Sequence, residues 1–365
     1  MKTGAQKKRW EHYLFREGGG WLQGIFLAPL LMCSWFYGVI IRVRVALYRV
    51  GLFKIRQLPC KVISVGNITV GGTGKTPLVA ALAKELRQRG LRAAILSRGY
   101  KGAHEQTGGI VSDGKKRYLT PAEAGDEPFM LAQMLADVPV VVGKKRYEMG
   151  VDACERFALD VLLLDDGFQH LRVKRDVDIV LIDARNGFGN GHLFPRGPLR
   201  EPLANLQRAS LLVLTKSEPA TAQKGREAVV RRYAPNTPLY HSRYKPAFLR
   251  EAATRAIFSP DLLQGKRVFA FAGIADPGYF FYLLRGLGAN VVKTMHFPDH
   301  YDYKLEDVMM MRARRKTVDA FVTTEKDFVK LQQLPLDDIL LYVLGVDQEV
   351  REEGFYHTVF SALSL

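Results

Sequence analysis

The fold is decided by the stretch CKVISVGNITVGGTGKTPLVAALAKEL, residues 60–86, in which an apolar strand, a glycine-rich turn and an amphipathic helix follow one another. Glycines in the turn let backbone N–H groups converge on an anion, and the start of the helix adds its positive dipole end. Lys75 is placed to reach the terminal phosphates of a nucleotide, and Thr76 to place its hydroxyl on Mg²⁺. The stretch therefore predicts a nucleotide site made by Gly71, Gly72, Thr73, Gly74, Lys75 and Thr76.

The match to the Walker A pattern is partial, because the pattern asks for a glycine five residues before Gly74 and Thr69 stands there. The alternative is a glycine-rich turn that binds nothing. An apolar strand leading into the turn and an amphipathic helix leading out of it argue against that alternative.

Length and charge limit the class of protein. A chain of 365 residues accommodates two domains and an appendage. The net charge is +16, and residues 1–56 hold ten Lys/Arg against two Glu, which is half of the excess. Because these basic residues bracket an apolar run, they favour an anionic membrane surface over nucleic acid as the partner. The cysteines Cys33, Cys60 and Cys154 show no paired or metal-binding spacing and are interpreted as core or lipid-facing thiols in a reducing compartment.

The apolar run covers residues 21–41, carries no charge and is long enough as a helix to cross a bilayer. Pro29 interrupts it, and equal numbers of basic residues on its two sides give no orientation. A helix lying in the membrane interface, with aromatic side chains at headgroup level, is the favoured interpretation. A single membrane span and a buried core helix remain alternatives. No small-residue cleavage site follows, so no signal peptide is expected.

From Leu58 onward short Val/Ile/Leu runs alternate with helical patterns, which predicts an α/β fold: a P-loop NTPase-type parallel sheet sandwiched by helices. The rhythm falters at residues 241–265, which are interpreted as a linker, and a smaller α/β series follows. The expected division is a membrane-associated segment at 1–56, a P-loop domain at 57–240, the linker, and a C-terminal lobe at 266–365. Two lobes around a hinge suggest closure on a substrate.

Carboxylates follow two of these patterns. VLLLDD, residues 161–166, is an apolar strand ending in Asp165 and Asp166, the place where P-loop enzymes hold Mg²⁺. Asp165 is the first choice for that role and Asp166 the second. Asp126, in GDEP, has two open interpretations: it caps the next helix, or it takes a proton from an attacking hydroxyl.

Three further stretches remain ambiguous from their residues alone. FPDHYDY places His300 after a short strand, either as a surface histidine or as part of an α/β site. TTEKD reads as a strand-to-helix cap with Thr324 at the cap position. GNGHLFPRGPLREP, residues 189–202, is a connecting loop whose Arg196, Arg200 and Glu201 are suited to a substrate phosphate or Mg²⁺.

Taken together, these stretches resemble the tetraacyldisaccharide 4′-kinases, which phosphorylate the lipid A precursor of Gram-negative bacteria. The resemblance covers residues 55–345 and rests on eight motifs in the family's order: SVGNITVGGTGKTP, SRGYKG, GDEP, VGKKRY, DDGFQH, GNGHLFPRGPLREP, FPDHYDY and TTEKD. The family's own loop also lacks the glycine at the place of Thr69. Arg196 and Tyr301 are departures from the family pattern.

The resemblance implies transfer of the ATP γ-phosphate to the 4′-hydroxyl of a tetraacylated glucosamine disaccharide 1-phosphate at the cytoplasmic face of the inner membrane. It implies Asp126 as the catalytic base, His300 as the residue that orients or tunes it, and Asp165 and Asp166 as the acidic pair near Mg²⁺. Further residues fall in motifs that line the family's site: Arg98, Tyr100, Arg146, Gln169, His170, Arg200 and Glu201. The implied cofactors are ATP and Mg²⁺, the implied partners are the phosphoglycolipid and an anionic membrane surface, and nucleic acid is not expected.

Two other classes stay open from the residues alone. A P-loop GTPase or ATPase of the metallochaperone or partition type would use the nucleotide as a switch. The partition type usually has a lysine where Val70 stands, which counts against it, although LTKSE at residues 214–218 loosely echoes a guanine-reading loop. A membrane scaffold that only binds nucleotide would have no acceptor chemistry.

Overall fold

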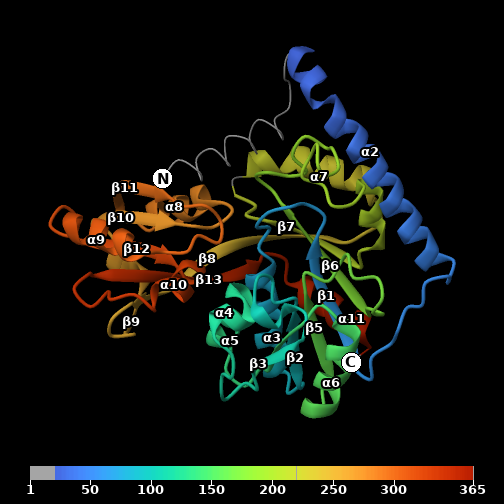
Figure 1. Ribbon diagram of the computed structural model, residues 1–365, viewed down its shortest axis with the longest axis horizontal. Helices are drawn as coiled ribbons and strands as arrows, with labels where there is room; N and C mark the ends of the chain where they lie inside the picture. The colour runs from blue at the N-terminus through green and yellow to red at the C-terminus, as the bar shows by residue number, and fades with distance from the viewer. Residues whose placement is uncertain (1–20, 219, 365) are drawn as a thin grey trace.

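The computed structural model describes residues 21–218 and 220–364, which form two lobes connected through one continuous sheet (Figure 1). The order of strands in the sheet is β11-β10-β12-β13-β8-β7-β6-β1-β5-β2-β4-β3, with β9 paired to β8. The predicted α/β class is confirmed, with parallel strands in both lobes and an antiparallel junction between them.

The first lobe holds the phosphate-binding stretch. Its strands are β1 (Lys61–Asn67), β2 (Ala93–Ser97), β3 (Gly109–Ser112), β4 (Val140–Val142), β5 (Val161–Asp165), β6 (Val177–Asp183) and β7 (Leu211–Thr215), all parallel except β3 at the edge. Its helices are α3 (Lys75–Gln88), α4 (Pro121–Ala124), α5 (Asp126–Met134), α6 (Arg146–Phe157) and α7 (Ala220–Tyr233), with 3₁₀ turns η1 (Ala103–Glu105) and η2 (Leu203–Arg208).

Helices cover both faces of this sheet. On one face Leu78, Leu82 and Leu86 of α3 share a core with α5, and on the other face α6 and α7 pack over separate clusters. Because both faces are covered, the central strands are apolar throughout, as in the fully buried β5. Cys154 of α6 is buried in one of these clusters, and its Sγ lies 2.7 Å from that of Cys60.

The second lobe is a smaller sheet with helices on both faces. It contains β9 (Ile257–Phe258), η3 (Pro260–Leu263), β10 (Arg267–Ala272), α8 (Pro277–Gly286), β11 (Asn290–His296), α9 (Leu305–Arg314), β12 (Ala320–Thr324), α10 (Glu325–Leu331) and β13 (Leu341–Val350). Phe269 and Phe271 face the core under α9 and α10, whereas Val268 and Ala270 face α8.

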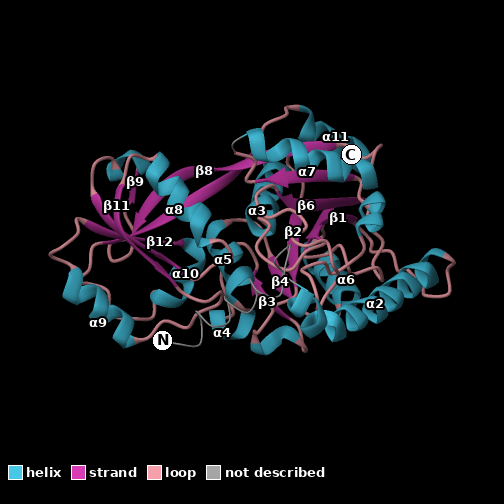
Figure 2. Ribbon diagram, turned by 90° about the horizontal axis from the view of Figure 1, so that it is seen from above, coloured by secondary structure: helices cyan, strands magenta, loops and turns pink. Residues whose placement is uncertain are grey.

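Residues 241–265 are not the irregular linker that the sequence suggested. Residues 241–251 belong to β8 (Leu239–Glu251), which pairs with β7 at its start and then runs antiparallel to β13. Figure 2 shows β8 passing from one lobe to the other. The apolar rhythm is broken because the pairing with β13 shifts register opposite Pro246, a place where a strand accommodates proline.

The last helix also departs from the expected division. The helix α11 (Gly354–Leu363) follows β13 but buries Phe355, Val359 and Leu363 in the core of the first lobe. The chain therefore crosses between the lobes twice, through β8 and through β13, and α11 lies against the first lobe (Figure 2). The connection between the lobes is a pair of hydrogen-bonded strands.

The N-terminal helix α2 (Trp21–Arg49) lies along the outside of the first lobe (Figure 1). One face is attached: Ser34 Oγ donates to the carbonyl of Leu193 at 2.8 Å and Tyr37 Oη to that of Arg200 at 2.8 Å. The opposite face exposes a stripe of apolar side chains: Leu31, Met32, Trp35, Phe36, Val39, Ile40 and Val43. Residues Leu27–Arg49 are long and apolar enough to span a membrane, with a mean hydropathy of 1.6. Attachment along one face favours a helix that lies in the interface.

Candidate active site

The glycine-rich turn closes onto the start of α3 as predicted. Gly71 and Gly74 have φ of +120° and +89°, a backbone conformation that side chains other than glycine rarely adopt. A Cβ on Gly74 would also lie 2.5 Å from the hydroxyl of Tyr244. At the end of β1, Asn67 donates from Nδ2 to Thr73 Oγ1 at 2.9 Å, which fixes the turn from inside. The turn is therefore shaped by its own sequence and ends at a helix N-terminus suited to phosphate.

Thr69, which replaces the first Walker glycine, lies in extended backbone. It forms an isolated β-bridge with Leu199, and the neighbouring Val70 N–H donates to the carbonyl of Pro198 at 2.7 Å. The Gly/Pro-rich loop 189–202 is thus placed directly beside the nucleotide turn. This contact explains why glycine is not needed at that position.

Asp166 is paired with two cations. Its carboxylate lies 3.3 Å from Lys75 Nζ and accepts from Arg200 Nη1 at 2.9 Å. Burial raises the pKa of Asp166, but Lys75 and Arg200 outweigh burial and hold it well below its usual range. Asp166 is therefore ionised and shared between the turn and the 189–202 loop.

Asp165 presents a different environment. Its side chain is buried, Oδ2 accepts from Ser97 Oγ at 3.0 Å, and Oδ1 has no hydrogen-bond partner. Burial, followed by the charges of Glu127 and Asp166, raises the pKa of Asp165 to about 6. A buried carboxylate oxygen without a partner is costly unless a cation meets it.

These oxygens fit Mg²⁺. Mg²⁺ prefers carboxylate and hydroxyl oxygens and usually takes its remaining ligands from water and substrate phosphates. Asp165 Oδ1 and the Thr76 hydroxyl are of this type, and within residues 21–218 and 220–364 no cluster of three or more His, Cys, Asp or Glu forms a complete protein site. The donor set suits a metal that arrives with a nucleotide.

Several expected site residues surround this carboxylate pair. Arg146 is buried and donates from Nη2 to the backbone carbonyl of Asp165 at 3.0 Å, and burial lowers its pKa to about 10. Gln169 Nε2 donates to the carbonyl of Asn67 at 2.8 Å. His170 is held neutral, because burial and then Arg146 lower its pKa to about 4. Arg146 and Gln169 thereby hold the last residues of β5 and β1 in place.

Two expected residues lie differently. Glu201 is buried, but its Oε2 lies 2.9 Å from Arg208 and accepts from Asn205 at 2.6 Å, so the structure does not join it to the Asp165–Asp166 pair. Arg98 forms a partly exposed pair with Glu105 at 2.8 Å. Glu201 and Arg98 therefore each form an ion pair with another residue of the first lobe.

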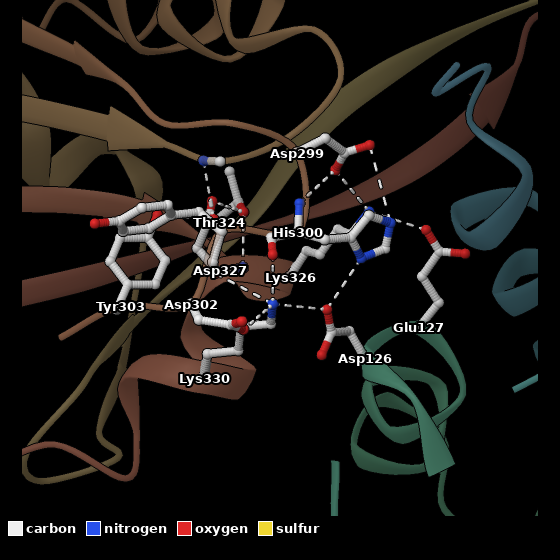
Figure 3. A network of polar contacts seen from close by, with 12 residues as sticks. Asp126, Glu127, Asp299, His300, Asp302, Tyr303, Thr324, Lys326, Asp327 and Lys330 are labelled. Atoms are coloured by element: carbon white, nitrogen blue, oxygen red, sulfur yellow. Dashed lines mark hydrogen bonds and ion pairs between the residues drawn. The ribbon is translucent and has the colours of Figure 1, made fainter. Parts of the chain in front are cut away.

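The second lobe contributes His300, which lies against Asp126 of the first lobe (Figure 3). Gly125 is the cap residue of α5 and Asp126 makes no capping bond, so the capping interpretation of Asp126 is wrong. Instead its Oδ2 lies 3.1 Å from His300 Nδ1 and 3.2 Å from Lys330 Nζ. Burial raises the pKa of Asp126, but His300 and Lys330 outweigh burial and keep it below its usual range.

His300 is held in an uncommon backbone conformation, with φ of +59°. For a non-glycine residue this costs free energy and persists only where surrounding contacts impose it. Lys330 Nζ donates to the carbonyl of His300 at 2.9 Å, and the ring of Tyr100 meets the imidazole edge-on at 6.0 Å between centroids. Asp126, Tyr100 and Lys330 thus define the position of the imidazole.

Two lysines of α10 were missed by the sequence reasoning, which predicted only the Thr324 cap. That cap is confirmed, since Thr324 Oγ1 accepts from the N–H of Asp327 at 3.2 Å. Lys326 Nζ donates to Glu127 at 3.0 Å and to Asp299 at 3.1 Å. Lys326 and Lys330 are four residues apart, which places both on one face of a helix; that spacing was the available signal.

The two groups of residues adjoin through Glu127. It follows Asp126 on α5, and its pKa is raised by burial but lowered on balance by Lys326 and then Lys75. The charge of Glu127 also raises the pKa of Asp165. The nucleotide turn, the carboxylate pair and the Asp126–His300 contact therefore form one site between the lobes.

Comparisons with known proteins agree with this arrangement. The family model described as Tetraacyldisaccharide-1-P 4'-kinase (LpxK) matches residues 26–364. A curated tetraacyldisaccharide 4'-kinase of Desulfatibacillum aliphaticivorans is 40% identical over 349 residues, covering 93% of each chain. Another, of Geobacter metallireducens, is 44% identical over 312 residues, covering 85% of this chain and 90% of that one.

A solved structure is similar over nearly the whole chain. It is LpxK from Aquifex aeolicus in complex with ATP, 34% identical, with a TM-score of 0.73, covering 92% of this chain and 98% of that chain. These likenesses exclude the nucleotide switch and the scaffold that the residues alone left open. The chain belongs to the tetraacyldisaccharide 4′-kinase family and is a kinase of lipid A biosynthesis.

Proposed function

We propose that Asp126 is the general base of this kinase and that His300 and Lys330, brought from the second lobe, hold and tune it. The observation that carries the proposal is the contact of Asp126 Oδ2 with both His300 Nδ1 and Lys330 Nζ across the two lobes. Phosphoryl transfer needs a carboxylate that accepts the proton of the attacking hydroxyl. With Oδ2 occupied by these two donors, Oδ1 remains to meet the 4′-hydroxyl.

The low pKa of Asp126 suits this role. Burial alone would favour the protonated acid, and the contacts with His300 and Lys330 reverse that preference. Transfer of a γ-phosphoryl group passes through a loose transition state, in which little proton removal is needed early. A carboxylate that is ionised at neutral pH is therefore more useful here than a strong base that is partly protonated.

The phosphates of ATP bind, in this proposal, to the backbone N–H groups of residues 71–76 and to Lys75. The contact of Lys75 with Asp166 keeps the lysine side chain beside the turn. Mg²⁺, when bound, would neutralise charge on the β- and γ-phosphates. Thr76 and Asp165 Oδ1 would hold it. Arg200, which neutralises Asp166, lies on the loop that also contacts α2.

The acceptor is a tetraacylated glucosamine disaccharide 1-phosphate, and its acyl chains stay in the membrane. The exposed apolar stripe of α2 is suited to the cytoplasmic leaflet of the inner membrane, with Arg42 and Arg49 near lipid phosphates. Tyr37 and Arg44 connect the same helix to the backbone of Arg200 and Gln169. The membrane helix is thus attached to the loops that surround the carboxylate pair.

The test is transfer of labelled γ-phosphate from ATP to the disaccharide lipid by the purified full-length chain in mixed micelles. A labelled phospholipid product is expected, and its loss in Asp126→Asn with retained ATP binding supports the base. Asp152→Asn, on the exposed face of α6, is the matched control. Hydrolysis of ATP without a lipid product, or full transfer by Asp126→Asn, contradicts the proposal.

A further inference from the structure

A buried lysine outside the site described above lies between the nucleotide turn and the second lobe. Lys216 follows β7, and only 4% of its side chain is exposed. Its Nζ donates to the carbonyl of Gly72 at 3.1 Å, to Asp183 at 2.7 Å and to Asp276 at 3.2 Å. A lysine ammonium has three donors, so each donor is used on a different segment.

The three segments come from both lobes. Gly72 is in the nucleotide turn, Asp183 ends β6, and Asp276 caps α8 of the second lobe by accepting from the N–H of Tyr279 at 3.2 Å. Beside it, Ala275 Cβ lies 3.0 Å from the place where a Cβ on Gly72 would stand. The second lobe therefore touches the turn here, apart from the Asp126–His300 contact.

The end of β7 holds two consecutive carbonyls of the turn. Lys216 holds that of Gly72, and Thr215 Oγ1 donates to that of Thr73 at 2.8 Å. A phosphate-binding turn works because its N–H groups face the anion, and a carbonyl rotated inward would repel it. Keeping these carbonyls turned toward β7 therefore preserves the anion-binding form.

The network is balanced in charge and its centre is buried: the side chains of Lys216 and Asp183 are 4% and 5% exposed, whereas those of Asp276 and Arg185 are 18% and 39% exposed. The charges of Asp183 and Asp276 face Lys216 and Arg185, whose Nη1 donates to Asp276 at 3.2 Å. Removing Lys216 leaves the buried carboxylate of Asp183 without its cation, which is costly. By contrast, the pair of Lys84 with Asp347, which connects α3 with β13 at 2.8 Å, has side chains 46% and 56% exposed and is of the kind that contributes little.

We propose that Lys216 is a positioning residue that holds the nucleotide turn in its phosphate-binding form and, through Asp276, couples that form to the seating of the second lobe. The inference rests on the proposed binding of ATP phosphates at residues 71–76. Coupling of this kind is reciprocal: bound ATP favours the seated second lobe, which carries His300 and Lys330.

The test compares Lys216→Met and Asp276→Asn with the controls Lys84→Met and Asp347→Asn in the full-length protein. The dissociation constant of a non-hydrolysable ATP analogue, kcat, both KM values and hydrogen exchange of residues 274–283 are measured. Lys216→Met is expected to weaken analogue binding by about tenfold or more, and Asp276→Asn by about fivefold with a lower kcat. The controls stay within about twofold.

Hydrogen exchange separates coupling from simple support of the fold. In the wild type the analogue is expected to slow exchange at the start of α8, and in Asp276→Asn this protection disappears although the analogue still binds at saturation. In the double variant Lys216→Met with Asp276→Asn, the loss of analogue affinity is expected to be smaller than the product of the two single losses, because both substitutions remove the same contact. A residue that only stabilised the fold would lower the melting temperature and leave the protection intact.

Two results overturn the proposal. One is wild-type analogue affinity in Lys216→Met, and the other is undiminished protection of α8 in Asp276→Asn. If Lys216→Met does not fold, because Asp183 is left unpaired, the variant Asp183→Asn with Lys216→Met removes that charge and the same criteria apply. Lys75→Ala tests the underlying ATP site separately: unchanged analogue affinity there contradicts the proposed function whatever Lys216 does.

Discussion

His300 Nδ1 and Asp126 Oδ2 lie 3.1 Å apart although 174 residues separate them in the chain. One comes from the second lobe and the other from the first turn of α5. The contact therefore exists only when the lobes are seated together, and it places the pKa of Asp126 under the control of the second lobe.

Asp126→Asn should remove the proton acceptor while keeping the shape of the side chain. Losing a general base typically costs about 10²- to 10⁴-fold in turnover. ATP affinity should change little, because Asp126 makes no contact with residues 71–76. Steady-state kinetics with the lipid acceptor and equilibrium binding of an ATP analogue measure the two quantities separately. Equal losses in turnover and ATP affinity would mean that Asp126 supports the site without acting on the acceptor.

Lys330→Met should shift the acidic limb of the pH profile of kcat/KM. Lys330 lowers the pKa of Asp126, so removing its charge raises that pKa and moves the limb to higher pH. Activity at low pH falls more than activity near neutrality. Lys326→Met is a close comparison on the same face of α10, since it pairs with Glu127 and Asp299 instead of Asp126. A limb that does not move in Lys330→Met would show that Asp126 is not the group reported by the profile.

Asp165 should make the metal-free protein less stable as pH rises. Its pKa in the folded state is about 6, above the usual value for aspartate, so the protonated form is favoured by folding. The resulting contribution to the free energy of unfolding is on the order of 2 kcal/mol. It is fully present below pH 4 and is lost as pH rises through 6. Glu325 has a pKa raised by burial to about 7 and titrates in an overlapping range. The comparison of wild type with Asp165→Asn therefore isolates the contribution of Asp165.

Urea unfolding in the presence of a chelator at several pH values between 4 and 8 measures this effect. Asp165→Asn should flatten the pH dependence and weaken binding of Mn²⁺, a spectroscopic substitute for Mg²⁺, in the presence of an ATP analogue. Asp160→Asn, at a partly exposed position just before β5, serves as the control. Unaltered Mn²⁺ affinity in Asp165→Asn would remove Asp165 from the metal site.

The sequence predicted the first lobe better than the junction between the lobes. Runs such as Val161–Asp165 are apolar throughout because both faces are covered, and that signal is local. The strand β8 was missed because its residues lack the apolar pattern of a strand. Its partner β13, which stabilises it by pairing, lies about a hundred residues away in the chain. The return of α11 to the first lobe was missed for the same reason, since an amphipathic helix does not reveal which core it joins.

The site shows the same limit. Lys75 and Asp166 belong to recognisable motifs, and the structure brings them to within 3.3 Å. Lys216 lies in LTKSE, which from its residues alone resembles only a guanine-reading loop, and Asp276 lies in none of the quoted motifs. The role of both comes from three segments that meet at one ammonium group. Asp126 had two interpretations that only the position of His300 could separate.

The exposed stripe of α2 gives a sharper test of membrane binding than removal of the helix. Deleting residues 1–50 would also remove the contacts of Tyr37 and Arg44 with the first lobe, so loss of activity would have two causes. Trp35→Glu with Ile40→Glu changes two side chains that are 63% and 64% exposed, and the fold should be unaffected. Burying each of these side chains in the interface contributes about 1.5–3 kcal/mol, so binding to anionic vesicles should fall by at least tenfold.

Vesicle co-sedimentation measures the binding. KM for the lipid should rise while KM for ATP stays constant. Val292→Glu, exposed on the second lobe, is the control, and equal vesicle binding by all three proteins would place the anchor elsewhere.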